Sequence, residues 1–288
     1  MWADVRRLRP MIAILGTGML GSGFARALIK KGETVHVWNR SPERAKALEA
    51  DGAKAFADAA QAVRGASRVH VVVSDDAAVD SVLAAAQLPA GTLVCDHTTT
   101  STAGALARSA RTDIVYVHAP VFMGPQNAAE STGMMMVSGE RARVERVKPL
   151  LAPMTGKLVD FGERVDAAAA FKLMGNTFLM AFTAGIGELL GLAKALGVAP
   201  AEAITLFEHF NPGTFTAARA KRMASGDYSQ ASWELVMARK DARLVQAEVD
   251  RAHVQLTLVP ALAAKMDAMI ARGHGKDDWT VIAKDFTS

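Results

Sequence analysis

One lysine lies in a segment where its charge is unfavourable. Lys172 falls within residues 166–196, which are apolar on nearly every face of a predicted helix. Burying an ammonium there costs free energy, and burial lowers the pKa of a lysine, which makes it a plausible proton donor or acceptor near neutral pH. Asn176 follows four residues later, on the same helical face. Lys172 is therefore a candidate general acid or base; the alternative is that its ammonium reaches water at an interdomain groove.

A glycine motif near the N-terminus predicts a bound dinucleotide. The motif is Gly16-Thr17-Gly18-Met19-Leu20-Gly21, which matches G-x-G-x-x-G, follows the apolar run 12–15 and opens a helix predicted over 22–31. We expect Gly16 to allow the tight turn, Gly18 to let the backbone approach a pyrophosphate, and Gly21 to let the helix pack close to the strand. The N–H groups at the helix start then face the anion. The alternative is a glycine turn without a ligand.

The end of the second predicted strand, 34–38, indicates which dinucleotide is bound. An NAD site usually places Asp or Glu here to bind the ribose 2′-OH, whereas Arg accommodates a 2′-phosphate. The residues that follow the strand are Asn39, Arg40 and Ser41, and no acidic residue stands at 38–41. The sequence therefore favours NADP over NAD and places these three residues in the cofactor site. Alternatively, Arg40 stacks on the adenine or reaches solvent.

Strands and helices alternate through the first half of the chain, and helices alone follow. Further strands are predicted at 68–73, 92–96, 114–119, 134–138 and 158–161, with Val73, Ser74 and Asp75 at a strand end that would face the cofactor. This alternation predicts an α/β fold with a Rossmann-type doubly wound parallel sheet, whose ligands bind at the carboxyl ends of the strands. We expect a cofactor domain over 1–164, a long interdomain helix over 165–196, buried between the domains, and an all-α domain over 197–288.

Composition excludes several classes of protein. The chain has 288 residues, half of them hydrophobic, which is enough for a sizeable core and two domains. Its 33 basic and 29 acidic residues form no long run of one sign, so we expect no nucleic-acid partner. Cys95 is the single cysteine, which excludes an intramolecular disulfide, and no Cys/His spacing suggests a metal site. A reducing, cytoplasmic setting fits.

Two segments bear on targeting and membrane insertion. Residues 1–10 contain three arginines but no apolar core of signal-peptide length. We expect them to be a disordered extension, or Met11 to be the natural start; a very short transit sequence is a third option. The apolar run between Lys172 and Glu188 falls short of the roughly 20 residues that a bilayer requires. We therefore expect no membrane span.

Six motifs occur in the order that characterises the β-hydroxyacid dehydrogenases. They are the glycine motif, NRSP at 39–42, DHTTTS at 96–101, APVFMG at 119–124, KLMGN at 172–176 and KD at 240–241. From Met11 to near its end, the chain resembles the group that contains 3-hydroxyisobutyrate dehydrogenase and the glyoxylate or succinic semialdehyde reductases. The resemblance implies hydride transfer between NADP(H) and the hydroxyl or carbonyl carbon of a small acid.

The resemblance also implies roles for individual residues. In similar proteins the lysine matching Lys172 is the catalytic acid or base, and the asparagine matching Asn176 helps to hold the substrate. The threonine matching Thr99 lies against the cofactor, and the lysine matching Lys240 reaches toward it from the helical domain. Groups after the strand at 92–96 and after Pro120 surround the substrate carboxylate, which implies substrate contacts at Thr98, Thr99, Thr100, Phe122, Met123 and Gly124.

Two stretches depart from the family's pattern. Where the family usually has Ser-Gly-Gly after Pro-Val, this chain has Phe122-Met123-Gly124, which removes a hydroxyl and adds bulk, so we expect a substrate other than the usual short hydroxy acid. Glycines usually stand four and six residues before the lysine, where this chain has Ala168 and Asp166. This change alters how closely the helix approaches the nicotinamide, unless Asp166 serves as a helix cap.

Two other functions remain open, as does the assembly. Imine reductases resemble this family in fold but usually lack the lysine. The presence of Lys172 therefore argues against imine reduction. A non-catalytic protein that binds NADPH is the other alternative.

His97 and His118 lie at strand ends, where a structural role is commoner than a catalytic one. The apolar helix and the resemblance suggest a homodimer or homotetramer.

Overall fold

The computed structural model describes residues 11–287, so the extension predicted over residues 1–10 lies outside the described part. The chain divides into two compact units, and the boundary between Thr177 and Phe178 falls inside helix α8 (Ala167–Ala195). Each unit is described in turn.

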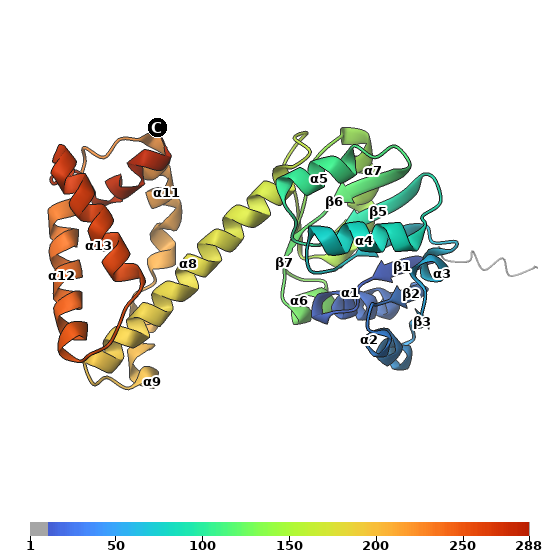
Figure 1. The fold of residues 1–288 in the computed structure, drawn as a ribbon, viewed down its shortest axis with the longest axis horizontal. Coiled ribbons are helices and arrows are strands. Elements are labelled where there is room, and N and C mark those ends of the chain that lie inside the picture. Colours follow the sequence, from blue (N-terminus) through green and yellow to red (C-terminus); the bar gives the residue numbers. More distant parts are fainter. Residues whose placement is uncertain (1–10, 288) are drawn as a thin grey trace, which may run out of the picture. The chain divides into compact units, whose positions relative to one another are not determined.

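The first unit contains a six-stranded parallel sheet with helices on its faces, as predicted (Figure 1). Its strand order is β3-β2-β1-β4-β5-β6. The strands are β1 (Ile12–Leu15), β2 (Val35–Trp38), β3 (Lys54–Phe56), β4 (Arg68–Val71), β5 (Thr92–Asp96) and β6 (Ile114–His118). The helices are α1 (Met19–Lys30), α2 (Pro42–Lys46), α3 (Ala59–Val63), α4 (Asp76–Ala86), α5 (Thr102–Ser109), α6 (Pro125–Glu130) and α7 (Arg141–Leu151).

The central strand β1 is buried on both faces. Ile12 and Ile14 belong to one hydrophobic cluster, whereas Ala13 and Leu15 belong to another on the opposite face. All four side chains are fully buried. Successive side chains of a strand point to opposite faces, so a continuous apolar run is what a doubly covered parallel sheet requires.

A second sheet has the order β7-β8-β9 and comprises β7 (Val121–Phe122), β8 (Met134–Val137) and β9 (Lys157–Asp160). β7 runs antiparallel to β8, and β8 runs parallel to β9. The sequence did not predict β3 or β7, which have three and two residues, too short for a periodic pattern to appear.

The second unit is helical. After the end of α8 it contains α9 (Pro200–Ala203), α10 (Leu206–His209), α11 (Thr216–Ser225), α12 (Leu235–Arg251), α13 (Leu258–Met269) and a 3₁₀ helix, η5 (Trp279–Phe286). Its core contains Leu235, Met269 and Val281. In the first unit, α2 is followed directly by a 3₁₀ turn, Ala47–Asp51.

The long helix α8 differs from the prediction in two ways. It was expected to be buried, but Phe178, Leu179 and Met180 are exposed by 56, 50 and 65%. Its 29 residues also make it long and apolar enough, by length and composition alone, to cross a bilayer, so the estimate from the shorter run 172–188 was wrong on length. Within the second unit, the Glu188 carboxylate accepts hydrogen bonds from backbone N–H groups just before and within α13.

Candidate functional site

The glycine turn between β1 and α1 has the geometry that the motif predicts. Gly16 has φ of +104°, and a Cβ there would lie 2.1 Å from the Val72 carbonyl oxygen, so only glycine fits the turn. A Cβ on Gly21 would lie 1.9 Å from the Gly16 carbonyl oxygen, which confirms the predicted close packing of helix on strand. At Gly18 a Cβ would meet nothing within 4 Å. The space above Gly18 is therefore open to a ligand.

Asn39 connects the end of β2 to this turn. Its Oδ1 accepts a hydrogen bond from the Thr17 amide at 3.0 Å, and its Nδ2 donates to the Ser41 carbonyl oxygen at 3.1 Å. The Gly16 amide donates to the Trp38 carbonyl oxygen at 2.8 Å. These bonds fix the glycine turn against the strand end where the predicted NADP-selective residues lie.

A cavity of about 580 Å³ opens between the glycine turn, the end of β2 and the start of α4. It brings together eight of the predicted cofactor residues: Gly16, Gly18, Asn39, Arg40, Ser41, Val73, Ser74 and Asp75. Its volume lies within the range of cofactor pockets. The predicted cofactor residues Thr17, Met19, Leu20, Gly21 and Thr99 are not among its lining residues, and their contacts with a cofactor stay predictions.

Two arginines line this cavity without an acidic partner. Arg40 and Arg44 form no side-chain hydrogen bond or ion pair with any residue in the described range 11–287. The sequence pattern did not indicate Arg44, although it follows Arg40 by only four residues. Two unpaired guanidinium groups beside an open glycine turn suit a phosphorylated ligand.

A buried network fixes the loop after β5, where the threonines lie. The Asp96 carboxylate accepts hydrogen bonds from the Tyr116 hydroxyl at 2.5 Å and from the Thr98 amide at 2.9 Å. Arg108 donates to the Tyr116 hydroxyl and pairs with Asp76. Burial and the adjacent Asp96 carboxylate raise the pKa of Tyr116, so its hydroxyl remains a donor. The loop is thereby held rigidly at the carboxyl end of β5.

The three threonines of this loop have different surroundings. The Thr98 hydroxyl is buried and accepts a hydrogen bond from the Val73 amide at 3.1 Å. The Thr100 hydroxyl is buried beside His118 Nε2 at 3.2 Å. Thr99 is half-buried and has no side-chain hydrogen bond to another described residue. Among the three, Thr99 is the residue open to a ligand, and substrate contacts by Thr98 and Thr100 stay predictions.

Buried histidines connect the neighbouring strand ends. Arg68 Nε donates to His70 Nε2 at 3.0 Å, and His70 Nδ1 lies 2.9 Å from His97 Nε2. His97 Nδ1 lies 2.7 Å from the Ala119 carbonyl oxygen. Burial lowers the pKa of His70 well below its usual value and that of His97 to about 4, so both are neutral near pH 7. These contacts account for His97 as a structural residue.

Lys172 lies in the first turns of α8 with its ammonium nearly enclosed. The residue is only 9% exposed, and burial lowers its pKa. Within residues 11–287 its Nζ has no hydrogen-bond acceptor or carboxylate partner, and it lies 4.0 Å from the centroid of the Phe122 ring. Asn176, one turn later, is half-buried and also has no side-chain partner in the described chain. A buried cation without an anion is costly for stability, which is typical of a functional residue.

Ser138, at the end of β8, determines where α8 begins. Its hydroxyl accepts a hydrogen bond from the Ala168 amide at 2.9 Å and donates to the Val165 carbonyl oxygen at 3.1 Å. Asp166, considered as a helix cap, instead forms an ion pair with Arg164 at 2.7 Å. Ser138 therefore positions the helix turn that carries Lys172.

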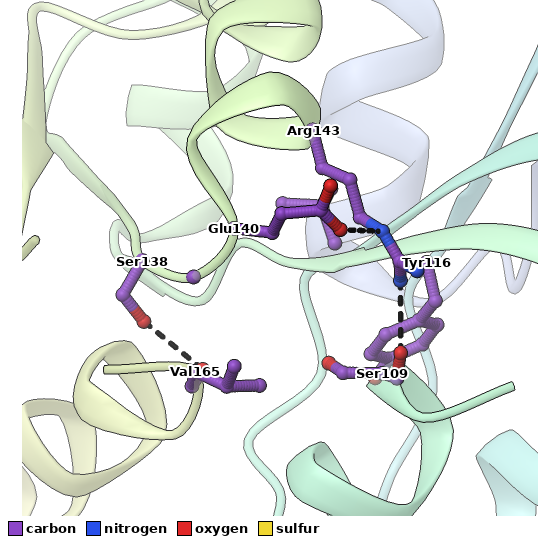
Figure 2. Close-up of a pocket in the computed structure, with 8 residues that line it drawn as sticks. Ser109, Tyr116, Ser138, Glu140, Arg143 and Val165 are labelled. Atoms are coloured by element: carbon purple, nitrogen blue, oxygen red, sulfur yellow. Dashed lines mark hydrogen bonds and ion pairs between the residues drawn. The ribbon is translucent and has the colours of Figure 1, made fainter. Parts of the chain in front are cut away.

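A small cavity beside Ser138 is distinct from the cofactor cavity (Figure 2). Its volume is about 90 Å³, too small for a dinucleotide. Arg143 closes one side by pairing with Glu140 and donating to the Ser109 carbonyl oxygen (Figure 2). We assign this cavity a structural role.

The remaining predicted site residues lie on β7 and in the second unit. Phe122 is half-buried on β7, and Met123 and Gly124 follow it. Lys240 lies on α12 and pairs with Asp241 at 2.8 Å. Its predicted approach to the cofactor stays a prediction. No cluster of three or more metal-ligating side chains occurs in the part of the chain that the structure describes.

The first unit can thus bind a dinucleotide and carries a buried amine. Comparisons with known proteins agree with this description. A family profile described as the NAD binding domain of 6-phosphogluconate dehydrogenase matches residues 11–162. The chain is 26% identical over 281 residues to 3-sulfolactaldehyde reductase of Escherichia coli (strain K12), covering 94% of each chain. It is 32% identical over 194 residues to a probable 3-hydroxyisobutyrate dehydrogenase of Mycobacterium tuberculosis (strain ATCC 25618 / H37Rv), covering 65% of each.

A solved structure shares the fold. An imine reductase from Myxococcus stipitatus in complex with NADP+ superposes with a TM-score of 0.88 at 21% identity, covering 96% of this chain and 99% of that one. At this identity the likeness shows the fold alone, because one fold supports several activities.

Proposed function

Because the chain belongs to the β-hydroxyacid dehydrogenase family and is an NAD(P)-binding oxidoreductase, we propose that it is an NADP(H)-dependent dehydrogenase in which Lys172 is the general acid or base. The substrate is a small hydroxy acid or the corresponding aldehyde acid, and the reaction interconverts its hydroxyl and carbonyl groups. The reaction is of the 3-hydroxyisobutyrate dehydrogenase type, with a substrate that differs from the usual short hydroxy acid at the end that meets Phe122 and Met123.

The observation that carries this proposal is the state of Lys172. Its ammonium is nearly enclosed, lacks an anionic partner among the described residues, and has a lowered pKa. A structural lysine would reach water or pair with a carboxylate. A lysine in the observed state can exchange a proton with a substrate oxygen, since burial lowers its pKa and makes the proton easier to release than in a solvated lysine.

The residues of the first unit fit a nicotinamide dinucleotide phosphate. The open space at Gly18 and the N–H groups of the first turn of α1, which receive no side-chain cap from Gly18, suit the pyrophosphate. Arg40 and Arg44 suit the 2′-phosphate, since neither is neutralised by a carboxylate in the described chain. When bound, the cofactor supplies or accepts the hydride.

The protein's own residues supply the proton and the orientation. During reduction, the Lys172 ammonium donates a proton to the carbonyl oxygen as it becomes a hydroxyl; during oxidation, the neutral amine accepts that proton. Asn176, on the same face of α8, orients the substrate oxygen or the lysine. The open Thr99 side chain lies on the rigid loop after β5 and contacts the bound ligands.

Replacement of Lys172 tests this proposal. We expect Lys172→Ala to lower kcat by about 10²–10⁴ while changing the Kd for NADPH by less than about twofold, because the proton donor is lost and the cofactor cavity is not. The matched control is Lys54→Ala, since Lys54 is an exposed lysine that also lies over a phenylalanine ring, Phe56. Turnover that survives in Lys172→Ala at the level of the control would contradict the assignment.

A substrate panel distinguishes this function from its alternatives. NADPH oxidation is followed with aldehyde acids, neutral ketones and cyclic imines. An imine reductase is the second candidate, which the shared fold keeps open and the presence of Lys172 opposes. NADPH binding without turnover of any class would indicate a non-catalytic binding protein.

We also propose a homodimer or homotetramer that acts in the cytoplasm on a small-molecule substrate, without a nucleic-acid partner or membrane insertion. The exposed apolar side chains of α8 support an assembly in which a second copy covers them.

A further inference from the structure

Phe122 contacts the catalytic helix at two points. The Lys172 Nζ lies 4.0 Å from the centroid of its ring. One helical turn away, a Cβ added to Gly175 would lie 2.2 Å from Phe122 Cζ, so the ring rests directly on the backbone of α8. Lys172 and Gly175 are three residues apart and share a face of the helix. The ring therefore fills the space that the missing side chain of Gly175 leaves and covers the ammonium beside it.

We propose, as an extension of the function proposed above, that Phe122 is a positioning residue for proton transfer: the face of its ring holds the Lys172 ammonium by a cation–π contact, and Gly175 provides the room for that ring. β7 has only two residues, but its pairing with β8 at Phe122 and Met134 fixes the position from which the ring reaches the helix.

A ring suits this position better than a carboxylate would. An adjacent carboxylate would raise the pKa of the lysine and occupy its N–H donors. A ring face attracts the cation without accepting a directed hydrogen bond, so the three donors of the ammonium remain available to a substrate oxygen.

No charged group opposes or assists this contact within the described chain. Burial alone lowers the pKa of Lys172, and no carboxylate, histidine or second cation from α8, β7 or any other described element contributes to the shift. The face of the Phe122 ring is thus the contact on the described chain that we expect to stabilise the charged form of the amine. Removal of the ring should therefore lower the pKa of Lys172.

Substitution of Phe122 tests the proposal through the pH dependence of reduction. Lys172 must be protonated to act as an acid, so the rate falls as pH rises through its pKa. This fall is the alkaline limb of the pH–rate profile. We expect Phe122→Leu, which keeps apolar bulk but loses the ring face, to move the alkaline limb to lower pH by about one unit, because the ammonium loses its cation–π contact. Phe122→Tyr keeps the ring and should leave the limb in place. Single-turnover rates, measured at saturating NADPH, report the chemical step.

A second variant disturbs the contact between the Phe122 ring and the Lys172 ammonium without changing Phe122. Gly175→Ala should displace the ring and move the limb in the same direction as Phe122→Leu. Phe56→Leu is the matched control, since its ring lies 5.1 Å from the exposed Lys54 Nζ, and it should not move the limb. The ¹³Cε resonance of Lys172, titrated in the protein without cofactor, gives the same pKa independently of activity.

The outcomes separate this inference from the function on which it rests. If Lys172→Ala abolishes turnover but the Lys172 titration is unchanged in folded Phe122→Leu, the positioning role is wrong and the proposed function stands. If Lys172→Ala retains turnover, the proposed function fails whatever Phe122 does. A shift shared by Phe122→Leu and Gly175→Ala, and absent from Phe122→Tyr and Phe56→Leu, supports the inference.

Discussion

Arg40 and Arg44 are the residues through which we propose that the chain distinguishes phosphorylated from unphosphorylated dinucleotides. Both are exposed, line the cofactor cavity and lack a carboxylate partner in the described range. We expect Arg40→Ala and Arg44→Ala each to weaken NADPH binding by about tenfold, since a charge-assisted hydrogen bond contributes about 1.5–3 kcal/mol, and to leave NADH binding unchanged. Fluorescence titration with both cofactors at one ionic strength measures this.

The control for these variants is Arg64→Ala, which removes an exposed arginine that does not line the cavity. Equal losses of NADPH and NADH affinity in Arg40→Ala would mean that the guanidinium stacks on the adenine, and would contradict selection of the 2′-phosphate.

Phe122 also bears on the substrate. The β7 loop offers an anion little, because the ring carries no donor and the Gly124 amide already donates to Asn127 Oδ1 at 2.9 Å. We expect Phe122→Ser, which restores the residue usual in the family, to raise kcat/KM for an aldehyde acid by at least about tenfold relative to a neutral aldehyde of equal length, since a hydroxyl can donate to the carboxylate. The ratio of the two kcat/KM values is the measurement. An unchanged ratio would place the carboxylate site elsewhere.

At the scale of elements, β4 is joined to the carboxyl ends of β5 and β6 by buried polar contacts. The chain Arg68, His70, His97 and the Ala119 carbonyl oxygen crosses three strands. It requires both histidines to be neutral, because each uses one ring nitrogen as donor and the other as acceptor. These strand ends carry the loops of the candidate site, so the network links the stability of the sheet to the geometry of that site.

This network predicts a loss of stability in acid. The pKa of His97 is about 4 in the folded chain, lowered chiefly by burial, against about 6.5 when unfolded. The unfolded chain therefore binds more protons, and stability is complete above about pH 6.5 and falls as pH decreases toward 4. Protonation of His97 alone is expected to lower the free energy of unfolding by about 3 kcal/mol once the pH is well below 4.

Urea unfolding between pH 7.5 and 4.5 measures this loss. His97→Gln keeps an amide donor but does not titrate, so its free energy of unfolding should depend less on pH than that of the wild type. His209→Gln, at an exposed histidine, is the control and should follow the wild type. A wild-type stability that is flat over this range would contradict the neutral-histidine network.

Local patterns predicted the elements better than the contacts between them. The glycine turn depends on neighbouring residues, so the sequence was sufficient for it. The partners of Thr98 and Lys172 come from 25 and 50 positions away, at Val73 and Phe122, and no local period encodes such pairs. Lys172 was found because an isolated cation in an apolar run is conspicuous; the ring that covers it was noticed only as a departure from the family.

At the scale of the whole molecule, the notable surface is a group of exposed apolar side chains on α8. Phe178, Leu179, Met180 and Phe182 are each about half exposed or more. Leu179, Met180, Thr183 and Ala184 line an apolar groove of about 450 Å³. Contiguous apolar surface of this kind is typical of an interface between proteins or with a bilayer. Since α8 also carries Lys172, assembly would act on the same helix as catalysis.

A substitution on this surface tests the proposed assembly. We expect the wild type to be a dimer or tetramer at micromolar concentration and Met180→Glu to weaken association by more than about tenfold, because a carboxylate would be buried without a partner. Leu106→Glu, at an exposed leucine of α5, is the control. Light scattering over a range of concentrations measures the mass. A wild type that is monomeric in solution and binds phosphatidylcholine vesicles through this surface would contradict self-association and indicate that α8 meets a bilayer instead.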